Sequence, residues 1–261
     1  MKKQKLKIKF IASSFLALLL FVLFFYFSKG KYFIPMQDLF ALSFNFEQPL
    51  NILSYMFIHI GLFHLFVNIF SLALFALILE QVTGSKHLIA LFFFSGFLGA
   101  ILFALYAPDT GLMGASIGIS GLLTSSLLLK PKHTIIGIII IAVMLLLALI
   151  PFSQNLLSAE KKVIVQKEEQ ISVDLNKAVE KKDTNKAVDL NRQLQKVVIE
   201  KKQFEQGEQF QIETKTNPLS HAFGAIAGII YLYAFQRKKL KEKIKEIVLW
   251  IRRPQFHSLL P

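Results

Sequence analysis

The chain has 261 residues, of which 54% are hydrophobic, and it contains 26 phenylalanines and no cysteine. Its apolar residues occur in long runs, a composition that excludes an ordinary soluble domain and is typical of a polytopic membrane protein. A formal net charge of +13 would suggest a nucleic acid partner in a soluble protein. Here the basic residues cluster at the chain ends and in short turns, so they indicate membrane topology and no nucleic acid partner.

The first predicted element is a transmembrane helix over residues 10–27, preceded by a basic segment at 1–9. A cleaved signal peptide is the alternative interpretation. No small-x-small cleavage site follows the apolar run, and the run is long enough to span a bilayer. We therefore expect residues 1–9 to be a cytoplasmic N-terminus.

Residues 10–152 are expected to form the membrane core, with five spans. After the first span, the apolar runs predict spans over residues 51–79, 88–106, 114–129 and 134–152. The intervening segments are an inner turn at 80–87, an outer loop at 107–113 and a basic inner turn at 130–133. Alternate crossing from an inner N-terminus places this basic turn inside, in agreement with the positive-inside rule.

The composition changes at residue 153. Residues 153–216 are rich in Lys, Glu and Gln with spaced Val, Leu and Ile, which favours one or two solvated helices over the alternative of disorder. Residues 217–235 predict a sixth span, and 236–261 a basic cytoplasmic tail suited to the inner membrane surface. The expected fold class is all-α: a polytopic membrane bundle of six transmembrane helices with a charged, helical, extramembrane insert on the outer side between spans five and six.

A run of small residues begins the predicted fourth span. It places Ser116 at a helix start, beside backbone N–H groups without intrahelical partners and beside the positive end of the helix dipole, where an oxyanion is stabilised. Gly114, Gly118, Gly121 and Ser125 recur at spacings that put them on one helix face, which allows another helix to approach closely. Packing alone is the simpler interpretation of such residues.

Polar residues within the predicted spans are costly and need an explanation. His64 and Asn68 are four residues apart and share a helix face, whereas His59 is about 140° away at ~100° per residue and is expected to meet a different neighbour. His221 lies near the start of the sixth span. Each histidine alone is explained by a hydrogen bond between helices, but three of them with a serine at similar depth suggest a catalytic site.

In order and spacing, these residues resemble the motifs of the rhomboid intramembrane serine proteases. The pattern His59-x4-His64-x3-Asn68 is similar to the family's His-x4-His-x3-Asn, and Gly114-Ala115-Ser116 to its Gly-x-Ser. His221-x2-Gly224-x3-Gly228 is similar to its His-x2-Gly-x3-Gly, and Glu80 to Ser85 to its inner turn. The resemblance covers residues 51–132 and 217–235.

The resemblance implies a Ser-His dyad, with Ser116 as nucleophile and His221 as general base, and no cofactor or metal. His64 and Asn68, with the Ser116 backbone N–H, would form the oxyanion hole. The implied structural residues are His59, Gly114, Gly118, Gly121, Gly224 and Gly228. The chemistry is consistent, because a serine needs an adjacent base and a tetrahedral intermediate needs donors aimed at its oxygen. No carboxylate lies in a predicted span near His221, which favours a dyad over a triad.

Three features depart from the family pattern. Ile117 replaces the usual glycine after the nucleophile and opposes a close approach of spans four and six, for which Gly118 is a candidate compensation. Ser120 is a rival nucleophile, but it lies nearer the inner turn than Ser116, and a site reached by water from outside favours Ser116. The long insert is atypical, as is the short first outer loop; because the insert is tethered to the span of His221, we hypothesise that it gates or recruits substrates.

The expected function is that of an intramembrane endopeptidase that cleaves single-span membrane proteins near the outer face of the plasma membrane. The partners are thus transmembrane substrates and the lipid bilayer. A rhomboid-like pseudoprotease that binds membrane clients is the first alternative, and its expected loss of serine or histidine is not seen. A transporter with a histidine proton relay is the second, and the sequence lacks the paired carboxylates or inverted repeats that it predicts.

Overall fold

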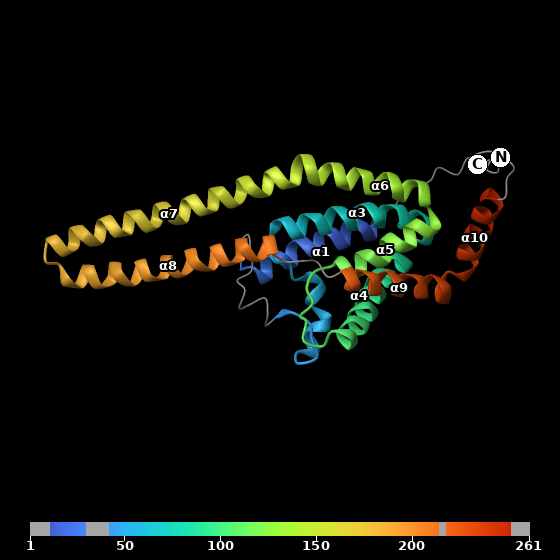
Figure 1. The fold of residues 1–261 in the computed structure, drawn as a ribbon, viewed down its shortest axis with the longest axis horizontal. Helices are drawn as coiled ribbons and strands as arrows, with labels where there is room; N and C mark the ends of the chain where they lie inside the picture. The colour runs from blue at the N-terminus through green and yellow to red at the C-terminus, as the bar shows by residue number, and fades with distance from the viewer. Residues whose placement is uncertain (1–10, 30–41, 214–217, 252–261) are drawn as a thin grey trace, which may run out of the picture.

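The computed structural model describes residues 11–29, 42–213 and 218–251, and its regular elements within these ranges are helices, apart from one isolated bridge between Phe44 and Leu112. A helical bundle is joined to a long two-helix hairpin that projects from one end (Figure 1). The bundle helices are α1 (Ile11–Phe27), α3 (Leu62–Thr83), α4 (Ser85–Tyr106), α5 (Ser116–Leu129), α6 (Pro131–Met144) and α9 (Pro218–Phe235).

Three described helices, α3, α4 and α9, are long and apolar enough to cross a membrane by themselves. Shorter apolar helices occupy 11–27, 116–129 and 131–147. The expected all-helical membrane architecture is therefore confirmed at this coarser level. The sixth predicted span coincides with α9, and the first coincides with α1. Residue 10, the first of the predicted span, lies outside the described residues.

The predicted start of the second span at residue 51 is wrong. Residues 49–57 form two short 3₁₀ turns, η1 (Pro49–Leu53) and η2 (Tyr55–Phe57), and α3 begins only at Leu62. Ile58 and Gly61 have extended backbones, which interrupts the helical hydrogen-bond ladder before α3. From Tyr55 to Gly61 the run is buried in the bundle without being helical throughout, whereas Leu53 before it is 66% exposed.

The connections at the opposite end of the bundle are shorter than expected. The predicted turn at 80–87 reduces to Gly84, whose φ of +81° is accessible to glycine at no steric cost, while α3 and α4 continue through the polar residues on either side. The predicted turn at 130–133 reduces to Lys130, since Pro131 starts α6 with the fixed φ suited to a first helical position.

A buried carboxylate joins three helices at this end. Glu80, in the last turn of α3, is only 6% exposed and accepts hydrogen bonds from the backbone N–H groups of Ala12 (2.9 Å) and Ser13 (3.1 Å). The hydroxyls of Ser13 and Ser85 donate to it at 2.8 and 2.6 Å. The first N–H groups of a helix lack intrahelical partners, so the carboxylate satisfies the start of α1 and interacts favourably with its dipole.

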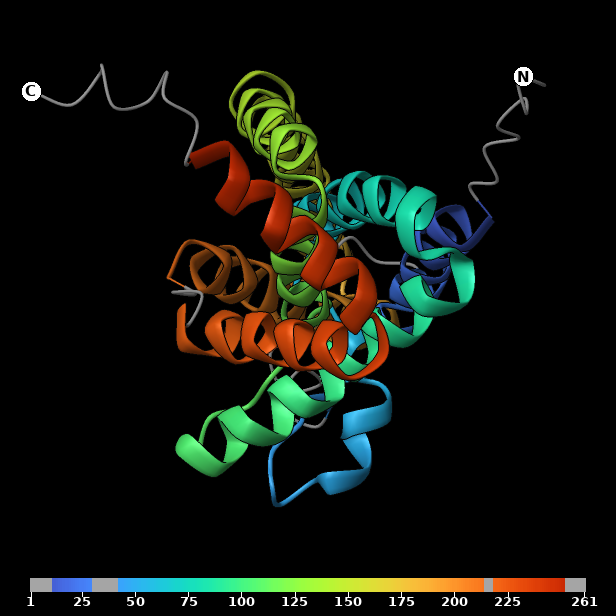
Figure 2. The ribbon, with the colours of Figure 1, turned by 90° about the vertical axis from the view of Figure 1, so that its right-hand side faces the viewer.

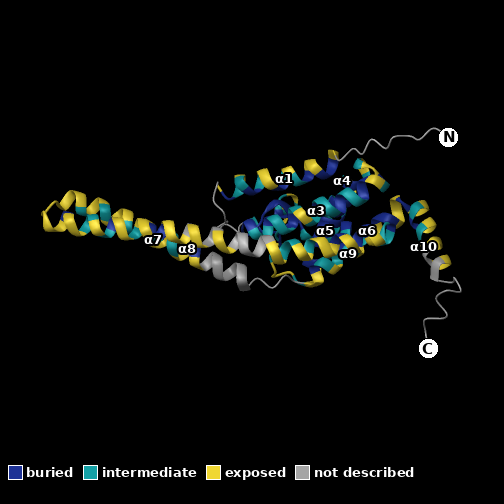
Figure 3. Cartoon of the chain, turned by 90° about the horizontal axis from the view of Figure 1, so that it is seen from above, coloured by how far each residue is buried: buried dark blue, intermediate teal, exposed yellow. Residues whose placement is uncertain are grey.

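The expected boundary between core and insert lies inside a helix. From α6 the chain passes through a π-helical turn (Leu145–Leu149) into α7 (Ile150–Glu180), and α8 (Thr184–Glu213) returns beside α7. Residues 153–213 therefore form parts of two long helices. Most of the described hairpin surface is exposed, in contrast to the bundle (Figure 3). The division of the chain at residue 153 stays a compositional prediction.

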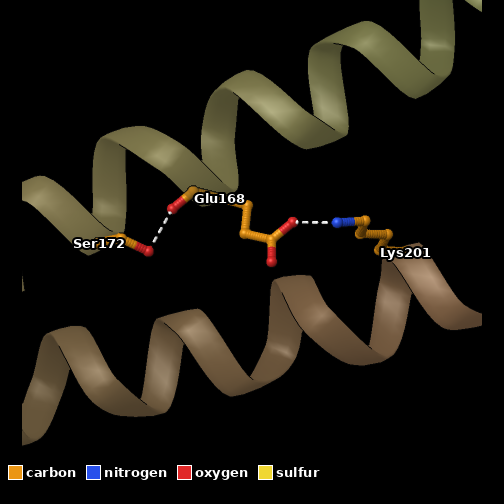
Figure 4. Close-up of polar contacts among 3 residues, drawn as sticks. All are labelled: Glu168, Ser172 and Lys201. Carbon is orange, nitrogen blue, oxygen red and sulfur yellow. Dashed lines mark hydrogen bonds and ion pairs between the residues drawn. The ribbon is translucent and has the colours of Figure 1, made fainter.

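The hairpin has its own narrow apolar seam. Ile164 and Ile171 of α7 pack with Val197 and Phe204 of α8, at seven-residue spacings that keep each pair on the facing side of its helix. An ion pair crosses the hairpin from Lys201 Nζ to a carboxylate oxygen of Glu168 at 2.7 Å (Figure 4). The hydrogen bond to Glu168 raises the pKa of Lys201 above its usual range.

The last described helix, α10 (Arg237–Ile251), crosses the end of the bundle that carries Gly84 and Lys130 (Figure 2). The Lys239 ammonium donates to the carbonyl oxygen of Val82 at 2.7 Å, near the end of α3. Cations at a helix C-terminus are stabilised by its dipole and satisfy its unpaired carbonyl groups.

We predict that Glu80→Ala destabilises the bundle by about 1–3 kcal/mol, because buried donors of α1 lose their acceptor. Thermal unfolding in detergent micelles measures the effect. Glu180→Ala, at the exposed end of α7, is the matched control and should leave the unfolding temperature unchanged. Equal unfolding temperatures for both variants would show that the carboxylate does not hold α1 in place.

Candidate active site

The three polar side chains singled out by the sequence lie at the starts of three helices. His64 is the third residue of α3, Ser116 is the first of α5, and His221 is the fourth of α9. These helices run in the same direction, so their N-terminal ends meet at the end of the bundle that carries the hairpin (Figure 1). The late start of α3 therefore brings His64 to the depth of Ser116, which a helix starting at residue 51 would not do.

Ser116 and His221 are hydrogen-bonded although 105 residues separate them in sequence. Ser116 Oγ lies 3.0 Å from His221 Nε2, and both residues are partly accessible. With the ring proton on Nδ1, the Nε2 atom accepts the serine proton, which is the geometry of a nucleophile and its base. Among the hydrogen bonds of the described residues, none joins a carboxylate to His221.

Ser120 lies in a different environment from Ser116. Its hydroxyl donates to the carbonyl oxygen of Ser116 at 2.8 Å, one turn earlier in α5. Such a bond to the preceding turn is the ordinary arrangement of a serine inside a helix. The geometry thus pairs His221 with Ser116 and not with Ser120.

His59 and His64 contact each other. His59 precedes α3, and its ring lies 5.0 Å from that of His64 in an edge-on arrangement, so the expectation that the two residues serve different neighbours is wrong. The expectation assumed one continuous helix, whereas the backbone is extended at Gly61, between the two histidines. His59 is fully buried and its Nδ1 lies 3.2 Å from the carbonyl oxygen of Phe57.

A glycine brings His64 to the start of α5. Gly114 has a φ of +94°, and a Cβ atom on it would lie 2.8 Å from His64 Cε1 and 3.0 Å from Nε2. The imidazole therefore packs against the backbone two residues before Ser116. The Ala115 cap supplies no side-chain hydrogen bond to the first N–H groups of α5, which is the arrangement that an oxyanion site needs.

Asn68 lies one turn below His64 on α3 and is buried. Its Nδ2 donates to the carbonyl oxygen of His64 at 2.8 Å, so one of its two N–H groups is bound to its own helix. The side chain thus shares a helix face with His64, as its spacing predicts.

The sequence-based search missed Tyr55. Its backbone carbonyl accepts a hydrogen bond from Gly114 N at 2.9 Å, and its hydroxyl donates to the carbonyl oxygen of Gly96 at 2.8 Å. Tyr55 therefore fixes the loop before Ser116 against α4. An aromatic residue in an apolar run gives no sequence signal for this role.

Glycines let α5 and α9 approach to backbone contact. A Cβ atom on Gly224 would overlap the carbonyl oxygen of Ile117, and one on Gly228 would lie 2.6 Å from that of Gly121. Gly118 instead faces Met56 and the backbone of Phe92, so it does not take part in the α5–α9 contact. The small residues of α5 therefore meet different neighbours, although their spacing suggested a common one.

The side chain of Ile117 is accommodated by a glycine on another helix. A Cβ atom on Gly99 of α4 would lie 2.6 Å from Ile117 Cγ2, and the same methyl group lies against Gly224. Ile117 is only 2% exposed. The isoleucine therefore fills the space left by Gly99 and Gly224 and does not keep α5 and α9 apart, contrary to the sequence-based expectation.

Comparison with known proteins agrees with this arrangement. Residues 47–166 match the model of the rhomboid domain family. The matched stretch is somewhat less than half of the chain. The rhomboid match includes His59, His64, Asn68 and Ser116 but ends before α9, so the pairing of His221 with Ser116 is an observation of the structure.

Two curated plant proteins are similar to part of this chain, both from Arabidopsis thaliana. The chain is 33% identical over 110 residues to RHOMBOID-like protein 6, mitochondrial, and this match covers 38% of the chain and 36% of the relative. It is 33% identical over 114 residues to Inactive RHOMBOID-like protein 8, covering 40% of this chain and 32% of the relative. The matches thus span about a third of each relative's length, and no solved structure matches the chain significantly.

The described side chains at this site offer several donor groups but no cluster of metal ligands. Within the part of the chain that the structure describes, no group of three or more His, Cys, Asp or Glu side chains is placed to hold a metal ion. The donors available at the site are imidazole, hydroxyl, carboxamide and backbone N–H groups. These suit acyl transfer through a serine.

We predict that Ile117→Ala destabilises the helical bundle by about 2–5 kcal/mol, because it leaves a cavity between Gly99 and Gly224. Ile117→Gly, which restores the residue usual in the family, should be at least as destabilising. Thermal unfolding in detergent measures both variants. Ile136→Ala, on the exposed face of α6, is the control and should have little effect; a more stable Ile117→Gly variant would refute this account of Ile117.

Proposed function

We propose that this protein belongs to the rhomboid family and is an intramembrane serine endopeptidase. The single observation that carries the proposal is the 3.0 Å contact between Ser116 Oγ and His221 Nε2 across two neighbouring helices. A hydroxyl beside an imidazole is a common packing arrangement, but here the hydroxyl lies at an uncapped helix start, and a second imidazole, that of His64, packs against the same loop.

In the proposed mechanism, Ser116 Oγ attacks the scissile carbonyl carbon while His221 Nε2 takes the serine proton. The negative charge on the former carbonyl oxygen is stabilised by His64, Asn68 and the Ser116 backbone N–H. Collapse of the tetrahedral intermediate breaks the C–N bond, and His221 gives its proton to the leaving amine. Water then hydrolyses the acyl-enzyme with His221 again acting as base. No cofactor takes part.

The proposed substrates are single-span membrane proteins, cut near the outer membrane face. A peptide bond within a helix is hidden from a nucleophile, so substrate segments that unwind easily at this depth are favoured. We further propose that all six bundle helices cross the plasma membrane with both chain termini in the cytoplasm. Support comes from the basic residues gathered at the end opposite the site, namely Lys86, Lys130, Lys132 and those of α10. One relative is named as mitochondrial, and that location belongs to the relative.

The second candidate function is that of a rhomboid-like protein that binds membrane clients without cutting them. It is favoured by the name of one relative, an inactive rhomboid-like protein. Against it stands the retention of both members of the Ser116–His221 pair.

We also propose that the α7–α8 hairpin gates or recruits substrates. The hairpin is connected to the bundle at both of its ends: α7 continues α6, and α8 precedes α9, which carries His221. The 31 residues of α7 extend over ~46 Å, so the hairpin extends far from the ring of helix starts.

We predict that wild type cleaves a model single-span substrate in proteoliposomes and that Ser116→Ala abolishes cleavage. His221→Ala should reduce the rate about 10²–10⁴-fold, the usual contribution of a general base. Ser120→Ala is the matched control, because its hydroxyl is bonded to the helix backbone, and it should retain activity.

Two outcomes of this assay would contradict the proposal. Cleavage by Ser116→Ala together with loss in Ser120→Ala would make Ser120 the nucleophile. Wild type that binds substrates from a broad panel and cuts none of them would establish the client-binding function instead.

For the hairpin, we predict that a shortened arm changes substrate range but not chemistry. Deleting residues 172–178 together with 191–197 removes one heptad from each helix, about 10 Å of length, and keeps the apolar seam in register. Cleavage of a substrate with a large folded outer domain should change, whereas a short transmembrane peptide should be cut at the wild-type rate. An unchanged range of substrates would end the recruitment hypothesis.

A further inference from the structure

The helix α10 carries an apolar face that only partly packs on the bundle. Leu240, Ile244 and Val248 recur every four residues and therefore share one side of the helix. Leu240 is buried against the bundle core, whereas Ile244 and Val248 are 47% and 39% exposed. The same face thus leaves the bundle and continues without a partner among the described residues.

The charges of α10 are sorted around this face. At ~100° per residue, Lys241, Lys243 and Lys245 lie about 60–100° to either side of Ile244. Glu242 and Glu246 lie about 160° from it, on the opposite side of the helix. The helix holds six basic residues and two acidic ones, with Lys243 paired to Glu246. Cations flank the apolar face and anions are kept away from it, as in helices that lie at a membrane surface.

The contacts of α10 with the bundle fix its direction. The Lys239 ammonium is bound to the Val82 carbonyl oxygen, and the Arg237 guanidinium lies 5.1 Å from the centre of the Tyr233 ring. These contacts hold the first turns of α10 across the end of the bundle and not along its axis (Figure 2). A helix in this direction lies parallel to the plane of a membrane that the bundle crosses.

We propose that α10 is an interfacial helix that binds the anionic headgroups of phospholipids on the basic side of the bundle. Ile244 and Val248 enter the boundary between headgroups and acyl chains, and Lys238, Lys241 and Lys245, all exposed, contact lipid phosphates. Charge complementarity selects this partner: a zwitterionic surface would use the apolar face but not the lysines. The inference does not depend on the proposed proteolytic activity.

The hairpin illustrates why a lipid partner suits α10 in particular. Helices α7 and α8 also carry apolar stripes, but these pack against each other along the seam of Ile164, Ile171, Val197 and Phe204. Their charges of both signs are interspersed along the helices. In α10, by contrast, the apolar face is open and charges of one sign border it.

The natural absence of cysteine makes the test direct. Single-cysteine variants Val248→Cys and Glu246→Cys of the full chain are labelled with an environment-sensitive fluorophore and reconstituted into vesicles of phosphatidylcholine with or without phosphatidylglycerol. Val179→Cys, on the exposed surface of the hairpin, is the solvent reference. Quenching by a lipid-borne nitroxide is compared with quenching by iodide on both sides of the membrane.

We expect the probe at 248 to be quenched by the nitroxide when phosphatidylglycerol is present, and the probes at 246 and 179 by iodide. Neutralising Lys238, Lys241 and Lys245 together as glutamines should weaken the phosphatidylglycerol-dependent partition about fivefold per lysine, and added salt should weaken it also. The matched control replaces Lys181, Lys182 and Lys186 of the hairpin with glutamine, and should have no effect.

Three results would overturn the proposal. Access of iodide to the probe at 248 in anionic vesicles would mean that the face stays in water. Protection from both quenchers would mean that protein covers it, either residues 252–261 or a second copy of the chain. Equal nitroxide quenching in pure phosphatidylcholine would remove the anionic headgroup from the interaction.

Discussion

The backbone contact between α5 and α9 is the constraint on which the site depends. A hydroxyl on one helix reaches an imidazole on another only if the helix axes are close, and in lipid there is no hydrophobic force to bring them together. Gly224 and Gly228 remove the side chains that would separate the two helices, and the carbonyl groups of Ile117 and Gly121 occupy that space. Van der Waals contact between backbones therefore sets the distance from Ser116 to His221.

The convergence of three helix starts gives the same site its electrostatic character. The N-terminal ends of α3, α5 and α9 each present the positive end of a helix dipole. Such surroundings favour a negative oxygen. The buried carboxylate of Glu80 lies at the other end of α3, where it satisfies the start of α1. The bundle therefore separates its buried anion from the site at which an anion would form.

Much of this architecture could be predicted from the sequence, because apolar runs and the spacing of polar residues are local signals. Ser116 at a helix start and the limits of α9 follow from such signals. Hydropathy failed at residues 51–61, where the chain is apolar but folds as 3₁₀ turns and extended backbone. The free energy of transferring side chains into lipid says how apolar a segment is, but not which hydrogen bonds its backbone makes. Near residue 153 the change in composition does not coincide with a helix end, since Lys, Glu and Gln are good helix formers and continue a helix that hydrophobic residues began.

Contacts between distant residues were the hardest to anticipate. Ile117 seemed to oppose close helix packing when judged by its neighbours in sequence, and Gly118 was the natural compensation. The residue that accommodates it, Gly99, lies on α4 and has no sequence link to the Ser116 motif. Tyr55 likewise acts through a backbone carbonyl, which residue identity does not reveal.

The single-residue connections at Gly84 and Lys130 also determine how the bundle can move. A single residue connects α3 to α4, and another connects α5 to α6, at the same end of the bundle. The carboxylate of Glu80 also links α1, α3 and α4 there through hydrogen bonds. Relative motion of these helices therefore has its pivot at that end and grows with distance from it. The largest displacements fall at the far end, where α3 begins beside His64 and α5 begins at Ser116. A small change of angle at either connection is therefore expected to change the width of the site.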